Sequence, residues 1–100
     1  MLRIIISAEA FADLGEGKLF YEAQEQGLGD YFVSCLRADI DGLRVTAGIH
    51  KTVEDYYRLL SRVFPYGIFY TLDKETVTVW AMIDLRRDPD WIHGRLTDYR

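Results

Sequence analysis

The sequence predicts an α/β fold of the α+β type, in which a two-helix hairpin covers one face of a mostly antiparallel sheet. Apolar residues recur at three- and four-residue spacing in the first half of the chain, as in helices, and at two-residue spacing in the second half, as in strands. Short turns separate the late strands, which favours antiparallel pairing. The expected element order is β-α-α-β-β-β, followed by a short C-terminal helix.

Length and composition limit the organisation of the chain. With 100 residues, of which 49% are hydrophobic, the chain can bury one core, and we expect residues 1–100 to form a single domain. The net charge is -4, and the acidic excess lies in residues 1–50, which hold four Lys/Arg and eight Asp/Glu. No apolar run approaches the roughly 20 residues that cross a bilayer, and no signal peptide is evident, so we expect a cytoplasmic protein.

The first elements are a strand over Leu2–Ile6 and a helix that Ser7 caps and that runs to about Gln26. Asp13, Glu16 and Glu25 of this helix are expected to face water. The residues expected to face the core are Ala10, Leu14, Gly17 and Tyr21.

A second helix follows a glycine-rich junction. Gly27 suits a left-handed position at the end of the first helix, and Asp30 suits the N-cap of the second, which fades near Gly48. Its apolar stripe consists of Phe32, Leu36, Ile40 and Leu43.

The period then changes to two, which predicts strands over Tyr56–Val63, Tyr66–Thr71 and Val77–Leu85, with a turn over Leu72–Glu75. In the last strand, alternation predicts one apolar face that packs on the helices and one mixed face where function would lie. The apolar set is Val77, Val79, Ala81, Ile83 and Leu85. The mixed set is Thr78, Trp80, Met82, Asp84 and Arg86.

The C-terminal helix is expected to begin at Pro89, with Asp88 as its N-cap, and to run to about Leu96. If this helix folds back over the sheet, Trp91, Ile92 and Leu96 would cover Trp80; otherwise Trp80 would be exposed.

Together these pieces resemble the RelE/ParE superfamily of toxins from bacterial type II toxin-antitoxin modules. The similarity extends over nearly the whole chain. The matching pieces are Asp13-Leu14, Phe20-Tyr21-Glu22 with Gln24, Gly27-Leu28-Gly29 with Phe32, Arg58-Leu59-Leu60 with Arg62, Phe64-Pro65-Tyr66 with Ile68 and Tyr70, and Arg86-Arg87-Asp88-Pro89 with Trp91 and Leu96.

The resemblance implies a toxin that a cognate antitoxin neutralises, and it leaves three alternatives for activity. ParE-like members inhibit DNA gyrase, RelE-like members cleave mRNA on the ribosome, and a degenerate toxin would retain only antitoxin binding. The Phe64-Pro65-Tyr66 and Arg86-Arg87-Asp88-Pro89 blocks look closer to the ParE-like branch. We therefore expect a gyrase inhibitor that acts by protein contact and is not an enzyme.

For target contact we expect Arg86, Arg87, Trp80 and Trp91, because arginines and large aromatic residues on a mixed face are typical of protein interfaces. Antitoxin-binding residues are not assigned. The antitoxin is expected to supply an extended or helical segment, which packs on the helical layer or adds a strand to a sheet edge, with basic groups matching the acidic first half.

If the chain is a nuclease, the candidate catalytic residues are Arg58, Arg62, Arg86 and His93, with His50 or Tyr99 as other proton-transfer groups. His50 lies in a loop with no evident partner. Ribosome-dependent nucleases dock on phosphate and are expected to be basic, whereas this chain has a pI near 5.0. One cysteine and two distant histidines form no metal motif, and no cofactor is expected.

Overall fold

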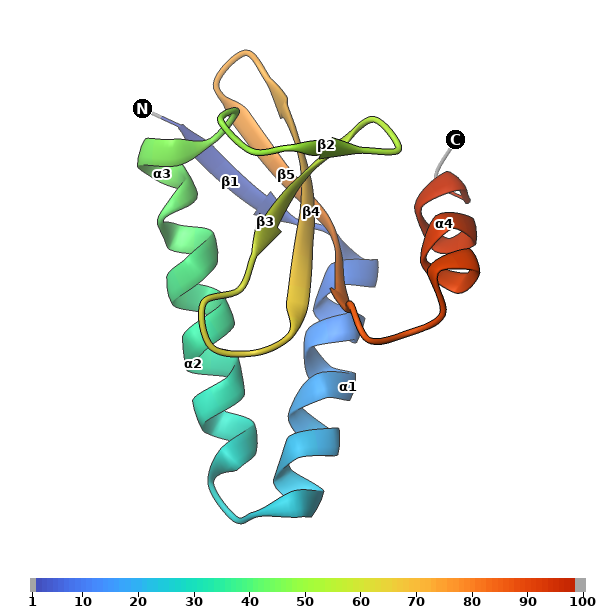
Figure 1. Ribbon diagram of the computed structural model, residues 1–100. Coiled ribbons are helices and arrows are strands. Elements are labelled where there is room, and N and C mark those ends of the chain that lie inside the picture. The colour runs from blue at the N-terminus through green and yellow to red at the C-terminus, as the bar shows by residue number, and fades with distance from the viewer. Residues whose placement is uncertain (1, 99–100) are drawn as a thin grey trace.

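The computed structural model of the chain describes residues 2–98 and shows an α+β fold, as the sequence predicted (Figure 1). A five-stranded sheet has the strand order β1-β5-β4-β3-β2; β1 pairs with β5 in parallel and the other neighbours are antiparallel. The elements are β1 (Arg3–Ile6), α1 (Ala8–Gln24), α2 (Leu28–Asp41), α3 (Leu43–Thr46), β2 (Thr52–Val53), β3 (Tyr56–Leu60), β4 (Tyr66–Asp73), β5 (Thr76–Asp84) and α4 (Pro89–Thr97).

The helical hairpin follows the predicted stripes. The four predicted core residues of α1 are the four buried ones, and the predicted stripe of α2 is buried too, with Leu43 lying in α3. Ser7 caps α1 as expected, since its hydroxyl accepts a hydrogen bond from the backbone N–H of Ala10 at 3.0 Å. Gly17 lies where α1 crosses α2, and a Cβ there would lie 2.5 Å from the Phe32 ring.

The junction between α1 and α2 differs from the prediction in one cap. Gly27 is left-handed, with φ of 88°, but it caps α2, and α1 ends earlier, at Gln24. Asp30 lies inside the first turn of α2, so its predicted N-cap role was wrong. The Glu22 carboxylate satisfies the exposed N–H groups instead, because it accepts hydrogen bonds from Gly27 and Gly29.

The strands also shift at their ends. β3 stops at Leu60, short of the predicted Val63. The next residue, Ser61, donates its hydroxyl to the Asp39 carboxylate of α2 at 2.8 Å. β4 runs to Asp73, beyond the predicted Thr71, so the turn shrinks to Lys74 and Glu75. The two-residue β2 was not predicted.

No helix among residues 2–98 is long and apolar enough to span a membrane.

The predicted faces of β5 were wrong beyond Val79. Phe69 of β4 pairs with Ala81, whereas Tyr70 pairs with Val79, so β5 carries one extra residue, Trp80, at this point. Such a bulge reverses the alternation, because the side-chain period of a strand is two. Met82 therefore packs in the core beneath α1 and α2.

Two apolar clusters result, one on each face of the sheet. The larger lies between the sheet and the helical hairpin and includes Val77, Val79 and Met82 of β5. The smaller lies on the opposite face and contains Ala81 and Ile83 of β5 with Leu96 of α4. The structure therefore puts α4 over the face that the sequence left open.

Candidate protein-interaction site

α4 is fixed at its start and at its buried face. Asp88 caps the helix by accepting the Asp90 N–H at 2.9 Å, and Pro89 occupies the first helical turn, as predicted. Leu96 is fully buried, and Ile92 packs beside it in the same cluster as Trp80. The tail helix therefore folds back over the sheet, as one of the two alternatives proposed, but Trp91 is not part of the cluster that contains Trp80.

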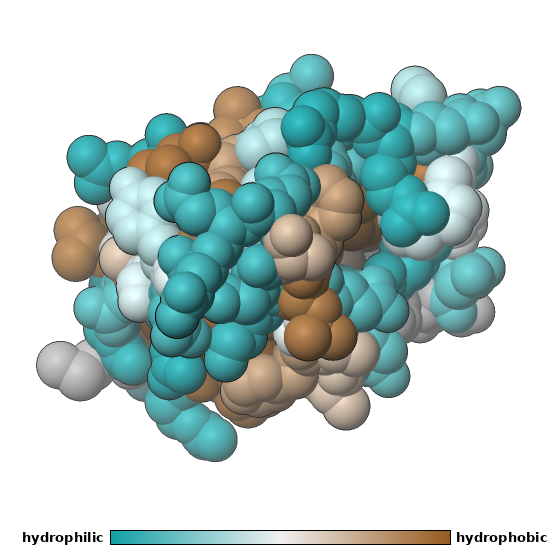
Figure 2. Space-filling view, turned by 90° about the horizontal axis from the view of Figure 1, so that it is seen from below, coloured by the Kyte–Doolittle hydropathy of each residue, from teal (hydrophilic) through white to brown (hydrophobic). Residues whose placement is uncertain are grey.

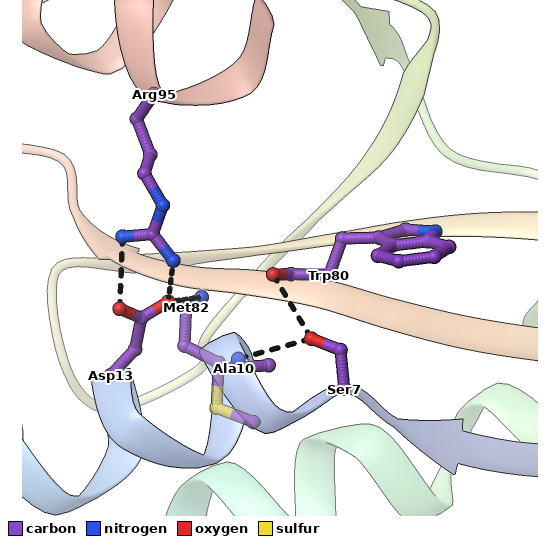
Figure 3. Close-up of polar contacts among 6 residues, drawn as sticks. All are labelled: Ser7, Ala10, Asp13, Trp80, Met82 and Arg95. Atoms are coloured by element: carbon purple, nitrogen blue, oxygen red, sulfur yellow. Dashed lines mark hydrogen bonds and ion pairs between the residues drawn. The ribbon is translucent and has the colours of Figure 1, made fainter. Parts of the chain in front are cut away.

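A carboxylate of α1 joins α4 to the sheet (Figure 3). Asp13 accepts two hydrogen bonds from the Arg95 guanidinium, at 2.9 and 2.6 Å, and a third from the backbone N–H of Met82 at 3.0 Å. The last hydrogen bond between β1 and β5 runs from the Ser7 N–H to the Val79 carbonyl. β5 continues beyond this point, so at Met82 it has no β1 residue beside it. The side chain of Asp13 is only 10% exposed, and the prediction that it faces water was wrong.

Sequence reasoning missed this pair because Asp13 and Arg95 lie 82 positions apart. Asp13 lies on α1 outside the apolar stripe, and Arg95 is one of several arginines in the second half of the chain. Neither residue carries a local signal of its partner. The ion pair becomes visible only once α4 is placed against α1.

Between α1, the end of β5 and α4 lies a groove of about 300 Å³. The view from below shows the surface hollowed between the helical hairpin and α4 (Figure 2). Exposed aromatic rings stand on both walls, Phe20 of α1 and Trp91 of α4, which are 52% and 39% exposed. The remaining lining residues are Asp13, Glu16, Gly17, Tyr66, Met82, Ile83, Asp84, Arg87 and Arg95.

Two of the residues expected for target contact, Arg87 and Trp91, meet in this groove. The Arg87 guanidinium carbon lies 3.5 Å from the centre of the Trp91 ring, a cation–π arrangement that holds both side chains in place at the surface. Trp80 lies elsewhere, because its ring belongs to the cluster under α4 and its Nε1 donates to Thr71 Oγ1 at 2.9 Å. Glu16 and Phe20 complete the groove without having been predicted.

Arg86 does not lie beside Trp80 as the sequence suggested. Its guanidinium donates to both oxygens of Asp84, at 3.0 and 2.7 Å, and reaches the Tyr21 hydroxyl of α1 at 3.5 Å. The hydrogen bonds from Arg86 lower the pKa of Asp84, and the same pairing raises the pKa of Arg86. Arg86 is thus a paired cation on the helix side of the sheet.

The candidate nuclease residues are spread over the molecule. Arg58 and His93 line a second pocket, of about 280 Å³, which is walled by apolar side chains of the sheet and α4. Arg62 and Arg86 are not among the residues that line it. His93 Nδ1 lies 2.8 Å from the Glu54 carboxylate, and the Nε of Arg58 is buried with no hydrogen-bond partner among residues 2–98.

Of the other proton-transfer candidates, His50 is not among the residues that line this pocket. His50 has a partner after all, because its Nδ1 is hydrogen bonded to the hydroxyl of the buried Tyr70. Burial lowers the pKa of His50. Tyr99 lies outside the described residues. Within residues 2–98, no group of three or more His, Cys, Asp or Glu side chains could hold a metal ion.

No protein-family model matches the sequence, and no curated protein matches it. Among solved structures, the chain is similar to one from the chromosomal ParDE TA system of P. aeruginosa. The two chains superpose with a TM-score of 0.68 at 13% sequence identity, and the match covers 82% of this chain and 94% of the other. The present chain therefore has the fold of that chain.

Proposed function

We propose that this chain is the toxin of a type II toxin-antitoxin module. Residues 1–100 form one toxin domain that inhibits DNA gyrase by protein contact in the cytoplasm, and a cognate antitoxin keeps it inactive. The observation that carries the proposal is the shared fold, since the match covers nearly the whole of a chain from a ParDE TA system. The sequence blocks that resemble ParE-like toxins support the same assignment.

The groove between α1 and α4 suits contact with a protein. It is an open surface with aromatic rings on both walls, and Trp and Arg side chains are the types that dominate binding energies at interfaces. Arg95 is engaged by Asp13, and Arg87 is held over the Trp91 ring. We assign target contact to Arg87 and Trp91. Arg86 lies nearby and is held by its hydrogen bonds to Asp84. We assign Trp80 a different role, the support of α4.

The test is a paired assay of the purified chain, freed from antitoxin, against DNA supercoiling by gyrase and against mRNA on translating ribosomes. The proposal expects loss of supercoiling with intact mRNA. Trp91→Ala and Arg87→Ala are each expected to weaken inhibition roughly tenfold or more, as for central interface residues. Arg62→Ala removes an exposed arginine outside the groove and should leave inhibition unchanged.

The second candidate function is a ribosome-dependent mRNA endoribonuclease. It is favoured by one observation, the meeting of Arg58 and His93 at a single pocket, with His93 held by Glu54. Cleaved mRNA with normal supercoiling would replace the gyrase proposal, and loss of cleavage in Arg58→Ala and His93→Ala would locate the site. A chain inactive in both assays that still binds its antitoxin would be a degenerate toxin.

A further inference from the structure

The pocket between the sheet and α4 is built mainly from apolar side chains. It has a volume of about 280 Å³, and six of its nine lining residues are apolar. The other three are Glu54, Arg58 and His93. The apolar six are Val53, Phe69, Leu85, Pro89, Ile92 and Leu96. A concave, mostly apolar pocket with a few polar groups is the usual form of a small-molecule site.

Strand pairing places Arg58 on the α4 side of the sheet. Arg58 of β3 lies directly opposite Phe69 of β4, and the side chains of opposite residues in an antiparallel pair point to the same face. Phe69 is buried in the apolar cluster beneath α4, so the Arg58 side chain lies on that face too. The preceding Tyr57 points to the other face, where its ring stacks on Tyr70 with centroids 5.2 Å apart.

Arg58 has no anionic partner among residues 2–98. It forms no ion pair there, and its Nε is buried without a hydrogen-bond acceptor. Proteins pair nearly all of their buried donors, because a buried N–H has given up its hydrogen bonds to water. The guanidinium of Arg58 can therefore pair with an acceptor from outside the chain.

The carboxylate that lines the pocket is engaged by a histidine. Glu54 lies in the turn between β2 and β3, and its carboxylate oxygen is 2.8 Å from Nδ1 of His93. This contact joins the turn to α4, beside which it lies (Figure 1). Arg58 is the one lysine or arginine among the described residues that line the pocket. The pocket thus combines a single permanent cation with apolar walls.

This combination favours a carboxylate over a phosphate. A guanidinium presents its donors in a planar fork that matches the two oxygens of a carboxylate. Phosphate sites gather several cations or clustered backbone N–H groups, whereas this pocket supplies one arginine. The apolar walls can also bury a hydrocarbon chain or ring, which inorganic phosphate lacks.

We propose that this pocket binds a small organic acid, a carboxylate carried by a short hydrocarbon chain or a single ring. The carboxylate pairs with Arg58, and the apolar body lies against Phe69, Leu85 and Ile92. The volume of about 280 Å³ sets the size of the acid, since sites for drug-sized ligands begin at roughly 300 Å³. The pocket shares no lining residue with the groove that contains Arg87 and Trp91, so this site is separate from the proposed target contact.

The test is a titration of the purified chain with benzoate and with hexanoate, followed by the amide chemical shifts of Phe69, Leu85 and Ile92. Saturable shifts with a Kd below about 1 mM are expected for at least one acid. Benzyl alcohol and hexanol keep the apolar bodies without the charge, and they should bind at least roughly tenfold more weakly. Absence of saturable shifts with both acids, or equal affinities for acid and alcohol, would overturn the proposal.

Two other probes separate this ligand from its competitors. Inorganic phosphate should leave the three amides unmoved; if phosphate binds here more tightly than the acids, the pocket is a phosphate site and the proposal is wrong. A short acetylated peptide ending in leucine carries the same carboxylate on a longer body. Binding of the peptide but of neither free acid would assign the pocket to a protein C-terminus and would also overturn the proposal.

Variants locate the binding and test a purely structural role. Arg58→Met keeps an unbranched apolar side chain without the charge and donors, and it should weaken acid binding roughly tenfold or more, whereas Arg62→Met, outside the pocket, should not. Val53→Phe fills the pocket and should abolish binding; retained binding places the acid elsewhere. Because Arg58→Met removes a donor without an acceptor, its urea midpoint should equal or exceed that of the wild type. A clear drop in the midpoint would show that Arg58 serves the fold and would count against the ligand role.

Discussion

Replacing Asp13 by alanine should be among the most damaging changes to this fold. The carboxylate joins α1, β5 and α4 through hydrogen bonds to the Met82 N–H and the Arg95 guanidinium. The side chain of Asp13 is 10% exposed and that of Arg95 is 21% exposed, so water replaces the lost contacts poorly. Asp13→Ala removes the carboxylate that accepts hydrogen bonds from a buried N–H and from a largely buried cation.

The expected cost follows from these two losses. Removing one partner of a fully buried ion pair costs about 3–5 kcal/mol, and leaving a buried donor unsatisfied costs about 1–3 kcal/mol. Because Arg95 keeps some access to solvent, and because the two terms share one carboxylate, we expect a loss of about 3 kcal/mol in the free energy of unfolding. That is a large part of the roughly 5–15 kcal/mol typical of a domain.

Asp13→Asn is the matched control. Its amide oxygen can still accept from Met82, but the charge that pairs with Arg95 is gone, so we expect a smaller loss, about 1–2 kcal/mol. Arg95→Met removes the ion pair from the other side, and the double variant Asp13→Asn/Arg95→Met should show a coupling energy of about 1–2 kcal/mol.

Urea unfolding monitored by tryptophan fluorescence and circular dichroism gives these free energies, provided that the urea dependence of the variants matches that of the wild type. A loss below about 1 kcal/mol for Asp13→Ala would show that the three contacts contribute little. Equal losses for the alanine and asparagine variants would refute the role assigned to the Met82 hydrogen bond.

Two further predictions concern α1 and the half-buried His50. Gly17→Ala should lower the free energy of unfolding by roughly 1–3 kcal/mol, because the new Cβ would lie 2.5 Å from the Phe32 ring. Gly15→Ala, with nothing within 4 Å, should raise it by up to about 1 kcal/mol, and urea unfolding of both variants decides the point. Burial lowers the pKa of His50 below 6.5, so the unfolded chain binds this proton first and stability should fall as the pH drops below 6.5. In His50→Asn, which keeps an acceptor for the Tyr70 hydroxyl, this loss should vanish; an unchanged pH dependence would contradict the assignment.

Much of the fold was predictable from the sequence because it depends on local signals. The buried stripes of α1 and α2, the Ser7 cap and the Asp88 cap with Pro89 are set by residues within about four positions of one another. The element order followed from the change of period near Tyr56. These features needed no knowledge of where distant segments lie.

The site was predictable only in part. Arg87 and Trp91 were both selected for target contact, and the structure brings them together because they lie four positions apart at the start of a helix whose cap was evident. Their opposing wall, Glu16 and Phe20 of α1, was not found. The expected grouping of Trp80 with Arg86 was wrong because strand alternation was assumed to continue through β5.

The sequence by itself thus determined the longer helices and strands, their order and the inward faces of α1 and α2, since helical period and capping act over one or two turns. Only the tertiary structure decided the register shift at Trp80, which reverses the faces of the last strand. It alone also decided the Asp13–Arg95 ion pair and the open edge of β1. The physical reason is shared by all three: each depends on hydrogen bonds between segments far apart in the chain, and such bonds leave no periodic trace in the sequence.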